Sequence, residues 1–155
     1  MIMDELEIIL REDTDEGALF YQPDPEVEEH LIYIRNPHFT VAEHRVELED
    51  PVLFRLNINR ILSAVKIVIP RHAWQIRPAR PIPITSLKAS LEFPLTTIQQ
   101  HSFNLKADVI TDADCTYTLL MFGKHETSPF WVALSSHCWA LIAANRLKGF
   151  FILLR

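Results

Sequence analysis

The sequence predicts an α+β fold, in which a mainly antiparallel sheet packs against one long C-terminal helix and a second, shorter helix. The sheet is predicted because apolar and polar residues alternate along 87–93 and along 103–109, a pattern typical of strands with one buried face. The helices are predicted after Asp50 and after Ser128. Each is a capping residue followed by a proline, which fits the first turn of a helix.

Short apolar segments in the first fifty residues are interpreted as strands. Residues 6–10 and 18–21 flank an acidic turn and suit a hairpin. Residues 31–35 alternate as a strand does, and residues 39–48 alternate with a change of phase that indicates a bulge or a bend. These segments supply the first strands of the predicted sheet.

Residues 51–65 form the shorter predicted helix, because their apolar positions largely follow helical spacing after the proline. The alternative is a strand, since apolar and polar residues alternate along 54–59. A short β segment is predicted at 66–69. Four prolines within 70–83 then exclude a helix and favour an extended surface loop.

The C-terminal third contains a predicted hairpin and the long helix. Residues 111–114 form a turn that joins the strand at 103–109 to a strand at 115–122. Residues 130–148 form the long helix, which ends at the capping Gly149. This helix is apolar on most sides, so we expect it to be buried.

A single domain spanning 1–155 is expected, because 155 residues with 48% hydrophobic content can fill one core. Charge and pattern divide it into an acidic part at 1–50, a basic part at 51–106 and a helix-containing C-terminal part at 107–155. Residues 1–50 have a net charge of 3 − 15 = −12, and the remainder has 12 − 5 = +7. The final apolar run, 150–154, is a buried strand or a contact between copies in a homo-oligomer.

A cytoplasmic location is expected. The first twenty residues carry acids where a secretory signal would carry basic residues. The longest apolar-biased stretch, 130–144, is shorter than the roughly 20 residues that span a bilayer, so no membrane segment is expected. Cys115 and Cys138 lie 23 positions apart and suit free thiols in a reducing compartment. A single disulfide between them is the alternative.

Common catalytic and cofactor patterns are absent from the sequence, so a non-enzymatic protein without cofactor or metal is favoured. The three glycines are isolated, which excludes a phosphate-binding loop and a dinucleotide-binding turn. Neither a GxSxG nor an HExxH pattern occurs.

The segment 112–116 is similar to the DxDxT pattern of haloacid-dehalogenase phosphatases. The resemblance implies a nucleophile at Asp112 and a general acid and base at Asp114. The segment has Cys115 where that family has glycine, and a turn with two solvated carboxylates accounts for the same residues. A small metal-assisted hydrolase around Asp108, Asp112 and Asp114 is therefore one alternative function.

The leading hypothesis is a protein-interaction module, such as an acidic inhibitor, an immunity-like protein or an adaptor subunit, that binds a basic protein partner. The proposed contact residues are the acidic side chains Glu12, Asp13, Asp15, Glu16, Asp24, Glu26, Glu28 and Glu29. The competing account is that the acidic and basic parts of the chain neutralise each other within the fold.

A nucleic-acid-associated subunit is the other alternative. The segment 71–80 combines cations that suit phosphates with an aromatic ring that suits base stacking. Its proposed contact residues are Arg71, Trp74, Arg77 and Arg80.

Overall fold

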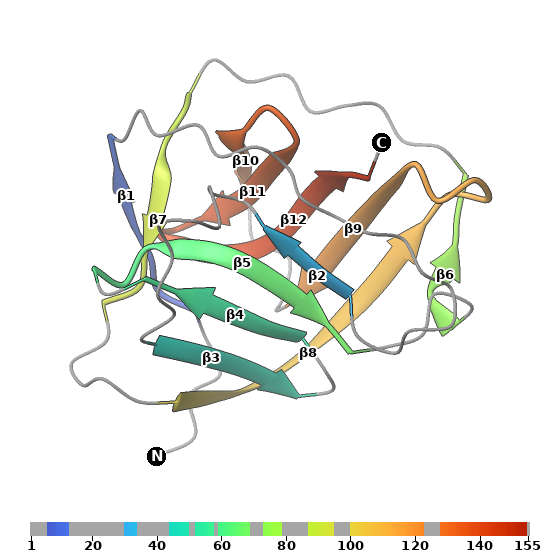
Figure 1. Ribbon diagram of the computed structural model, residues 1–155. Helices are drawn as coiled ribbons and strands as arrows, with labels where there is room; N and C mark the ends of the chain where they lie inside the picture. Colours follow the sequence, from blue (N-terminus) through green and yellow to red (C-terminus); the bar gives the residue numbers. More distant parts are fainter. Residues whose placement is uncertain are drawn as a thin grey trace.

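The computed structural model is a curled half-barrel of β-strands, drawn in Figure 1. It describes residues 6–12, 30–33, 44–49, 52–57, 59–68, 73–78, 87–94, 100–122 and 128–154. Strands make up 70% of this described chain, which contains no α-helix. The predicted α+β class is therefore wrong, and the described residues of the C-terminal part, 107–155, contain strands where a helix was expected.

The strands are short except for one. They are β1 (Ile9–Arg11), β2 (His30–Tyr33), β3 (His44–Glu49), β4 (Val52–Leu56), β5 (Leu62–Ile67), β6 (Gln75–Ile76), β7 (Ser90–Glu92), β8 (Gln100–Thr111), β9 (Tyr117–Phe122), β10 (Phe130–Ser135), β11 (Cys138–Ala143) and β12 (Arg146–Leu153).

The main sheet runs in the order β10-β11-β12-β9-β8-β3-β4-β5-β2, with β6 attached to β8. Its neighbours are antiparallel except for β3 with β8 and β6 with β8, which are parallel. The long strand β8 belongs to both halves of the sheet: its first part, up to Lys106, pairs with β3, and its last part, from Ala107, pairs with β9. A strand shared in this way lets a sheet turn a corner.

A two-stranded ribbon of β1 and β7 closes one side of the curl (Figure 1). At one edge, the backbone of Ala133 in β10 exchanges hydrogen bonds of 3.0 Å with Leu87 and Ala89, which precede β7. At the other end, Phe93 donates its backbone N–H to the carbonyl of Arg60 at 2.9 Å. The ribbon therefore connects β10 to the turn between β4 and β5.

The predicted helix at 51–65 is wrong: its described part is β4, a turn and the start of β5. The side-chain oxygen of Asn57 accepts hydrogen bonds from the backbone N–H groups of Asn59 at 2.8 Å and Ile61 at 3.1 Å. Arg60 has a φ of 66°, which no helix contains. The turn signal of asparagine thus outweighs the cap and proline, and the alternative strand reading is confirmed for β4.

The predicted long helix at 130–148 is also wrong. These residues form β10, β11 and the start of β12, separated by two-residue turns at 136–137 and 144–145. Both faces of these strands are apolar, since one face packs in the core and the other in a second cluster. The alternation that identifies a half-buried strand is therefore missing, and Gly149 is a sheet residue and not a helix cap.

Several predicted strands are confirmed. The described parts of the strands expected at 31–35, 39–48, 87–93, 103–109, 115–122 and 150–154 correspond to β2, β3, β7, β8, β9 and β12. Residues 34–35 and 39–43 lie outside the described residues. The hairpin of β8 and β9 around 111–114 is confirmed as well. Residues 18–21 and most of 70–83 lie outside the described residues.

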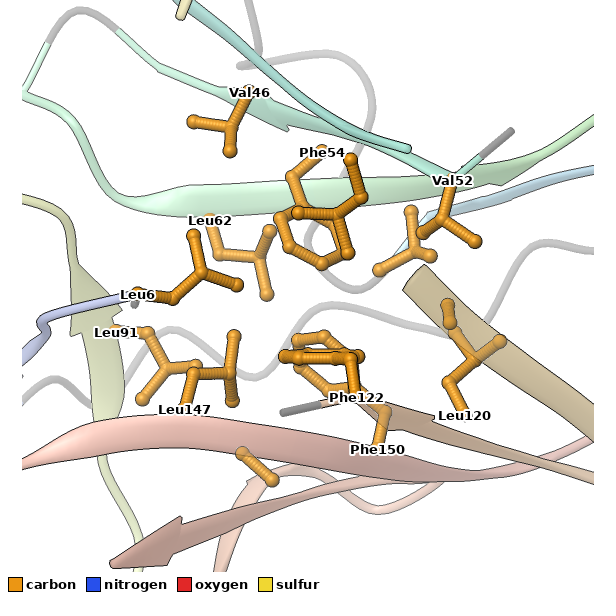
Figure 2. Close-up of a cluster of buried hydrophobic side chains, with 14 of the residues drawn as sticks. Leu6, Val46, Val52, Phe54, Leu62, Leu91, Leu120, Phe122, Leu147 and Phe150 are labelled. Carbon is orange, nitrogen blue, oxygen red and sulfur yellow. The ribbon is translucent and has the colours of Figure 1, made fainter. Parts of the chain in front are cut away.

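The core lies between the two halves of the curled sheet and is centred on Phe54 of β4, which has no exposed surface. Its ring centroid lies 5.5 Å from that of Phe150 in β12, 5.9 Å from that of Phe122 in β9 and 6.1 Å from that of Phe93. Figure 2 shows this cluster, with Phe54 above and Phe122 and Phe150 below. One aromatic ring thus links the first half of the sheet to the second.

Candidate interaction surface

A second apolar cluster lies on the outer face of the β8–β12 half of the sheet, and we call it the Phe151 face. It consists of the buried Ile110, Tyr117, Leu119 and Phe151, with the partly exposed Met121, Trp131, Trp139 and Leu153 packed around them. These side chains come from all five strands, β8 to β12. This half of the sheet therefore has an apolar cluster on its outer side as well as on its inner side.

Strand alternation explains how the two clusters separate. In β12, Phe150 and Ile152 belong to the core, whereas Phe151 and Leu153 belong to the outer cluster. Successive side chains of a strand point to opposite faces of the sheet. An unbroken apolar run therefore supplies both clusters at once.

Aromatic rings surround Phe151. Its ring stacks on Tyr117 with a centroid distance of 5.1 Å and an interplanar angle of 18°. The indoles of Trp139 and Trp131 meet the same ring edge to face, at 5.9 Å and 6.4 Å. Such pairs are favourable arrangements of aromatic quadrupoles, so the two tryptophans are held in fixed positions while part of each remains exposed.

Gly149 lies in the middle of this half of the sheet, paired with Leu141 of β11 and Met121 of β9. A Cβ atom at this position would lie 2.4 Å from the carbonyl oxygen of Leu120 and 2.9 Å from the sulfur of Met121. No side chain fits such a separation. Glycine is therefore required for β9 and β12 to pair this closely below the outer face.

One edge of the outer face is fixed by the segment after β6. The hydroxyl of Tyr117 donates a hydrogen bond to the carbonyl of Pro78 at 3.1 Å. The backbone N–H of Arg77 donates to the carbonyl of Thr111 at 2.9 Å. These two bonds fasten the segment beside the β8–β9 hairpin.

The turn between β8 and β9 contains the two aspartates of the hydrolase alternative. The Asp112 carboxylate accepts hydrogen bonds from the backbone N–H of Thr116, at 2.7 Å, and from the Thr116 hydroxyl. Asp114 is exposed and, with Arg77, lines a shallow open pocket beside this turn. Asp112 thus acts as the acceptor that closes the turn.

Asp108 lies apart from that pocket. It is an exposed residue of β8 opposite Met121. Within the described ranges, no group of three or more His, Cys, Asp or Glu side chains is placed to hold a metal ion. The three aspartates are therefore not brought together there as a metal site.

The residues proposed for nucleic-acid contact do not form one exposed surface among the described residues either. Arg77 is exposed, and its guanidinium donates a hydrogen bond to the side chain of Gln75 at 3.2 Å. Trp74 is only 3% exposed and belongs to the core, so its ring has no free face for stacking on a base. Arg71 and Arg80 lie outside the described residues.

Of the proposed acidic contact residues, Glu12 is described and is exposed just after β1. The others, Asp13, Asp15, Glu16, Asp24, Glu26, Glu28 and Glu29, lie outside the described residues. The expected oligomer contact at 150–154 belongs mostly to β12, whose two edges pair with β11 and β9.

Both cysteines are free thiols, as the sequence indicates, and the disulfide alternative is not formed. Burial raises the pKa of the Cys138 thiol far above its ordinary value. Cys115 is partly exposed in the β8–β9 turn and has a φ of 53°.

Sequence reasoning missed the Phe151 face because it placed Trp131 and Trp139 in a predicted buried helix. One signal was available: the two tryptophans flank Ser136-His137, a polar pair within an apolar stretch. Such a pair between two short apolar runs is typical of a hairpin turn, and a hairpin would have placed both indoles on one face.

A scan against protein-family models found no family that matches this chain, and a search of curated proteins found no similar sequence. Among the residues that the structure covers, none belongs to a helix with the length and hydropathy needed to cross a lipid bilayer.

Proposed function

We propose that this chain is a non-enzymatic protein-interaction module and that the Phe151 face contacts its partner. The observation that carries the proposal is the partial exposure of Trp131 and Trp139 on a sheet whose inner face already fills the core. An antiparallel sheet needs only one apolar face to fold, and the other is commonly polar. An additional aromatic face suits binding, because Trp, Tyr, Phe and Met are enriched at protein interfaces.

The charge of the first fifty residues supports a basic partner. Their net charge of 3 − 15 = −12 is large for so short a segment, and charge complementarity accelerates association and selects partners. In this proposal the acidic residues, including the exposed Glu12, attract the partner, and the aromatic face supplies the affinity. An inhibitor, an immunity-like protein or an adaptor subunit of a cytoplasmic complex would use such an arrangement.

Site-specific photo-crosslinking tests the face. The photoreactive residue p-benzoylphenylalanine replaces Trp139 in one variant and Leu87 in a control, because Leu87 is 44% exposed and does not belong to the face. In extract of the native host, we expect one protein of defined mass to be captured from the Trp139 position and not from the Leu87 position. The same capture pattern from both positions would contradict the proposal.

Once the partner is captured, substitutions separate the contribution of the Phe151 face to affinity from the contribution of the acidic residues to the association rate. Trp131→Gln with Trp139→Gln should weaken its binding at least about tenfold, which is the effect of losing interface anchors, with an unchanged circular dichroism spectrum. Neutralising Glu12, Asp13, Asp15 and Glu16 should mainly slow association, and the difference should disappear at high salt. Full binding by the double tryptophan variant would reject the Phe151 face as the contact surface.

A further inference from the structure

Two arginines lie directly opposite each other on the outer face of the other half of the sheet. Arg45 of β3 pairs in register with Arg55 of β4, and these strands lie side by side in Figure 1. Arg45 is exposed and Arg55 is partly buried. Like charges directly opposite on antiparallel strands repel each other, so this arrangement needs a compensating negative charge.

The described protein residues do not supply that charge. Glu47 is the next residue of β3 on the same face, but it lies opposite Leu53 and forms no ion pair with either arginine. The ion pair between described side chains, Arg11 with Glu92, lies in the β1–β7 ribbon. Both guanidinium groups are therefore without a described carboxylate partner.

Burial makes the absence of a partner more significant at Arg55. Its Nε atom is inaccessible to solvent and has no hydrogen-bond acceptor. On its other side, Arg55 lies opposite Ala64 of β5, which has no exposed surface. Burying the Nε–H group of a guanidinium without a hydrogen-bond acceptor is unfavourable, so a bound group that provides an acceptor would stabilise this arrangement.

We propose that Arg45 and Arg55 form a clamp for a phosphate group. Each guanidinium presents its N–H donors as a planar fork that matches phosphate oxygens. A phosphate group presents negatively charged oxygens in a tetrahedral arrangement, so that one group can accept hydrogen bonds from two adjacent arginines at once. The site is separate from the Phe151 face and independent of the function proposed for it.

Thermal unfolding of the full chain tests the clamp, with inorganic phosphate as the probe and sodium chloride at equal ionic strength as the reference. Phosphate should raise the Tm of the wild type. The rise should be lost in Arg45→Gln, an exposed position whose substitution leaves the fold intact, and kept in the control Arg77→Gln, an exposed arginine elsewhere. Equal Tm values in phosphate and chloride, or an undiminished rise in Arg45→Gln, would overturn the proposal.

A charge reversal gives an independent readout. Arg45→Glu places a carboxylate opposite Arg55 and should raise the Tm in chloride while removing the response to phosphate. A lower Tm in chloride would show that the arginines do not repel each other and would count against the clamp.

Calorimetric titration distinguishes the sources of the phosphate. Inorganic phosphate, a nucleoside monophosphate and a single-stranded oligonucleotide are compared, and Arg45→Gln should weaken each about tenfold or more, as expected for the loss of charged hydrogen bonds. Tighter binding of the oligonucleotide identifies a nucleic-acid backbone, and tighter binding of the monophosphate identifies a small phosphorylated ligand. Binding of none of the three overturns the proposal.

Discussion

At the scale of single residues, Asp112 has the clearest dependence on pH. Burial by itself raises the pKa of its carboxyl group. The hydrogen bonds from the side chain and backbone of Thr116 lower the pKa by more than burial raises it, so the pKa lies below its ordinary value of 3.8. A folded-state pKa below the unfolded value contributes stability that is complete above pH 3.8 and is lost as the pH falls through the folded value. Asp112→Asn should remove this contribution.

Urea unfolding at several pH values checks this prediction. The wild type should be more stable than Asp112→Asn near pH 7, and the difference should shrink below about pH 4, where the unfolded carboxyl becomes protonated. The exposed Asp114, treated in the same way as Asp114→Asn, is the control and should show a smaller difference at every pH. A stability difference for Asp112→Asn that does not change with pH would refute the assignment.

The pair of arginines depends on the register in which two strands pair, and the amino-acid sequence alone does not show that register. Arg45 and Arg55 are ten positions apart in the sequence, and only the pairing of β3 with β4 brings them together. Shifting that pairing by one residue would turn one side chain to the opposite face. By contrast, the role of Asp112 in a turn could be predicted, because aspartate followed by small and polar residues favours that local geometry.

At the scale of the element, the turn between β11 and β12 can be improved. Ala144 and Asn145 have φ values of 51° and 60° between the paired residues Ala143 and Arg146, which is a two-residue hairpin turn of the kind that favours Asn-Gly. Alanine at positive φ costs roughly 1 kcal/mol. Ala144→Asn with Asn145→Gly should therefore stabilise the protein by about 1 kcal/mol.

Chemical denaturation measures this gain, and a second turn supplies the control. Ala113 lies in the β8–β9 turn and is not among the residues with positive φ, so Ala113→Gly should leave the stability unchanged or lower it by increasing the entropy of the unfolded chain. If the Asn-Gly variant gains nothing while its hairpin remains intact, the left-handed conformation of Ala144 is not strained.

Strands could be predicted from the sequence where one face of the strand is buried and the other is exposed to water. β8 alternates Leu105, Ala107 and Val109 with exposed polar residues, so its pattern has a period of two. β10 and β11 are apolar on both faces, because their outward side chains Trp131 and Trp139 belong to the Phe151 face, whereas the outward side chains of most half-buried strands are polar. Their sequence then resembles a buried helix, and only the turn residues between the strands indicate otherwise.

At the scale of the whole molecule, Phe54 connects the two halves of the sheet. Its ring contacts Phe122 and Phe150 across the core, and it has no exposed surface. Phe54→Ala should destabilise the protein by about 3–5 kcal/mol, because it removes a large buried ring and leaves a cavity. Phe130→Ala is the matched control, since Phe130 is 43% exposed, and should change the stability by less than about 0.5 kcal/mol.

Urea denaturation followed by two probes checks whether the halves unfold together. Tryptophan fluorescence reports on Trp131 and Trp139 in the second half and on Trp74 in the core. Far-ultraviolet circular dichroism reports on the entire sheet. Coincident transitions that both move to lower urea in Phe54→Ala are expected. A shift of one transition alone would mean that the halves unfold separately.

The parallel pairing of β3 with β8 also affects how the protein is made. The paired residues Arg45 and Gln100 are 100 − 45 = 55 positions apart, and closing so long a loop loses chain entropy before any contact compensates for it. A ribosome adds roughly 5–20 residues per second, so β8 is completed roughly 3–13 s after Arg45 is made. Throughout that interval the nascent chain carries β3 with an unpaired edge, which can join another chain.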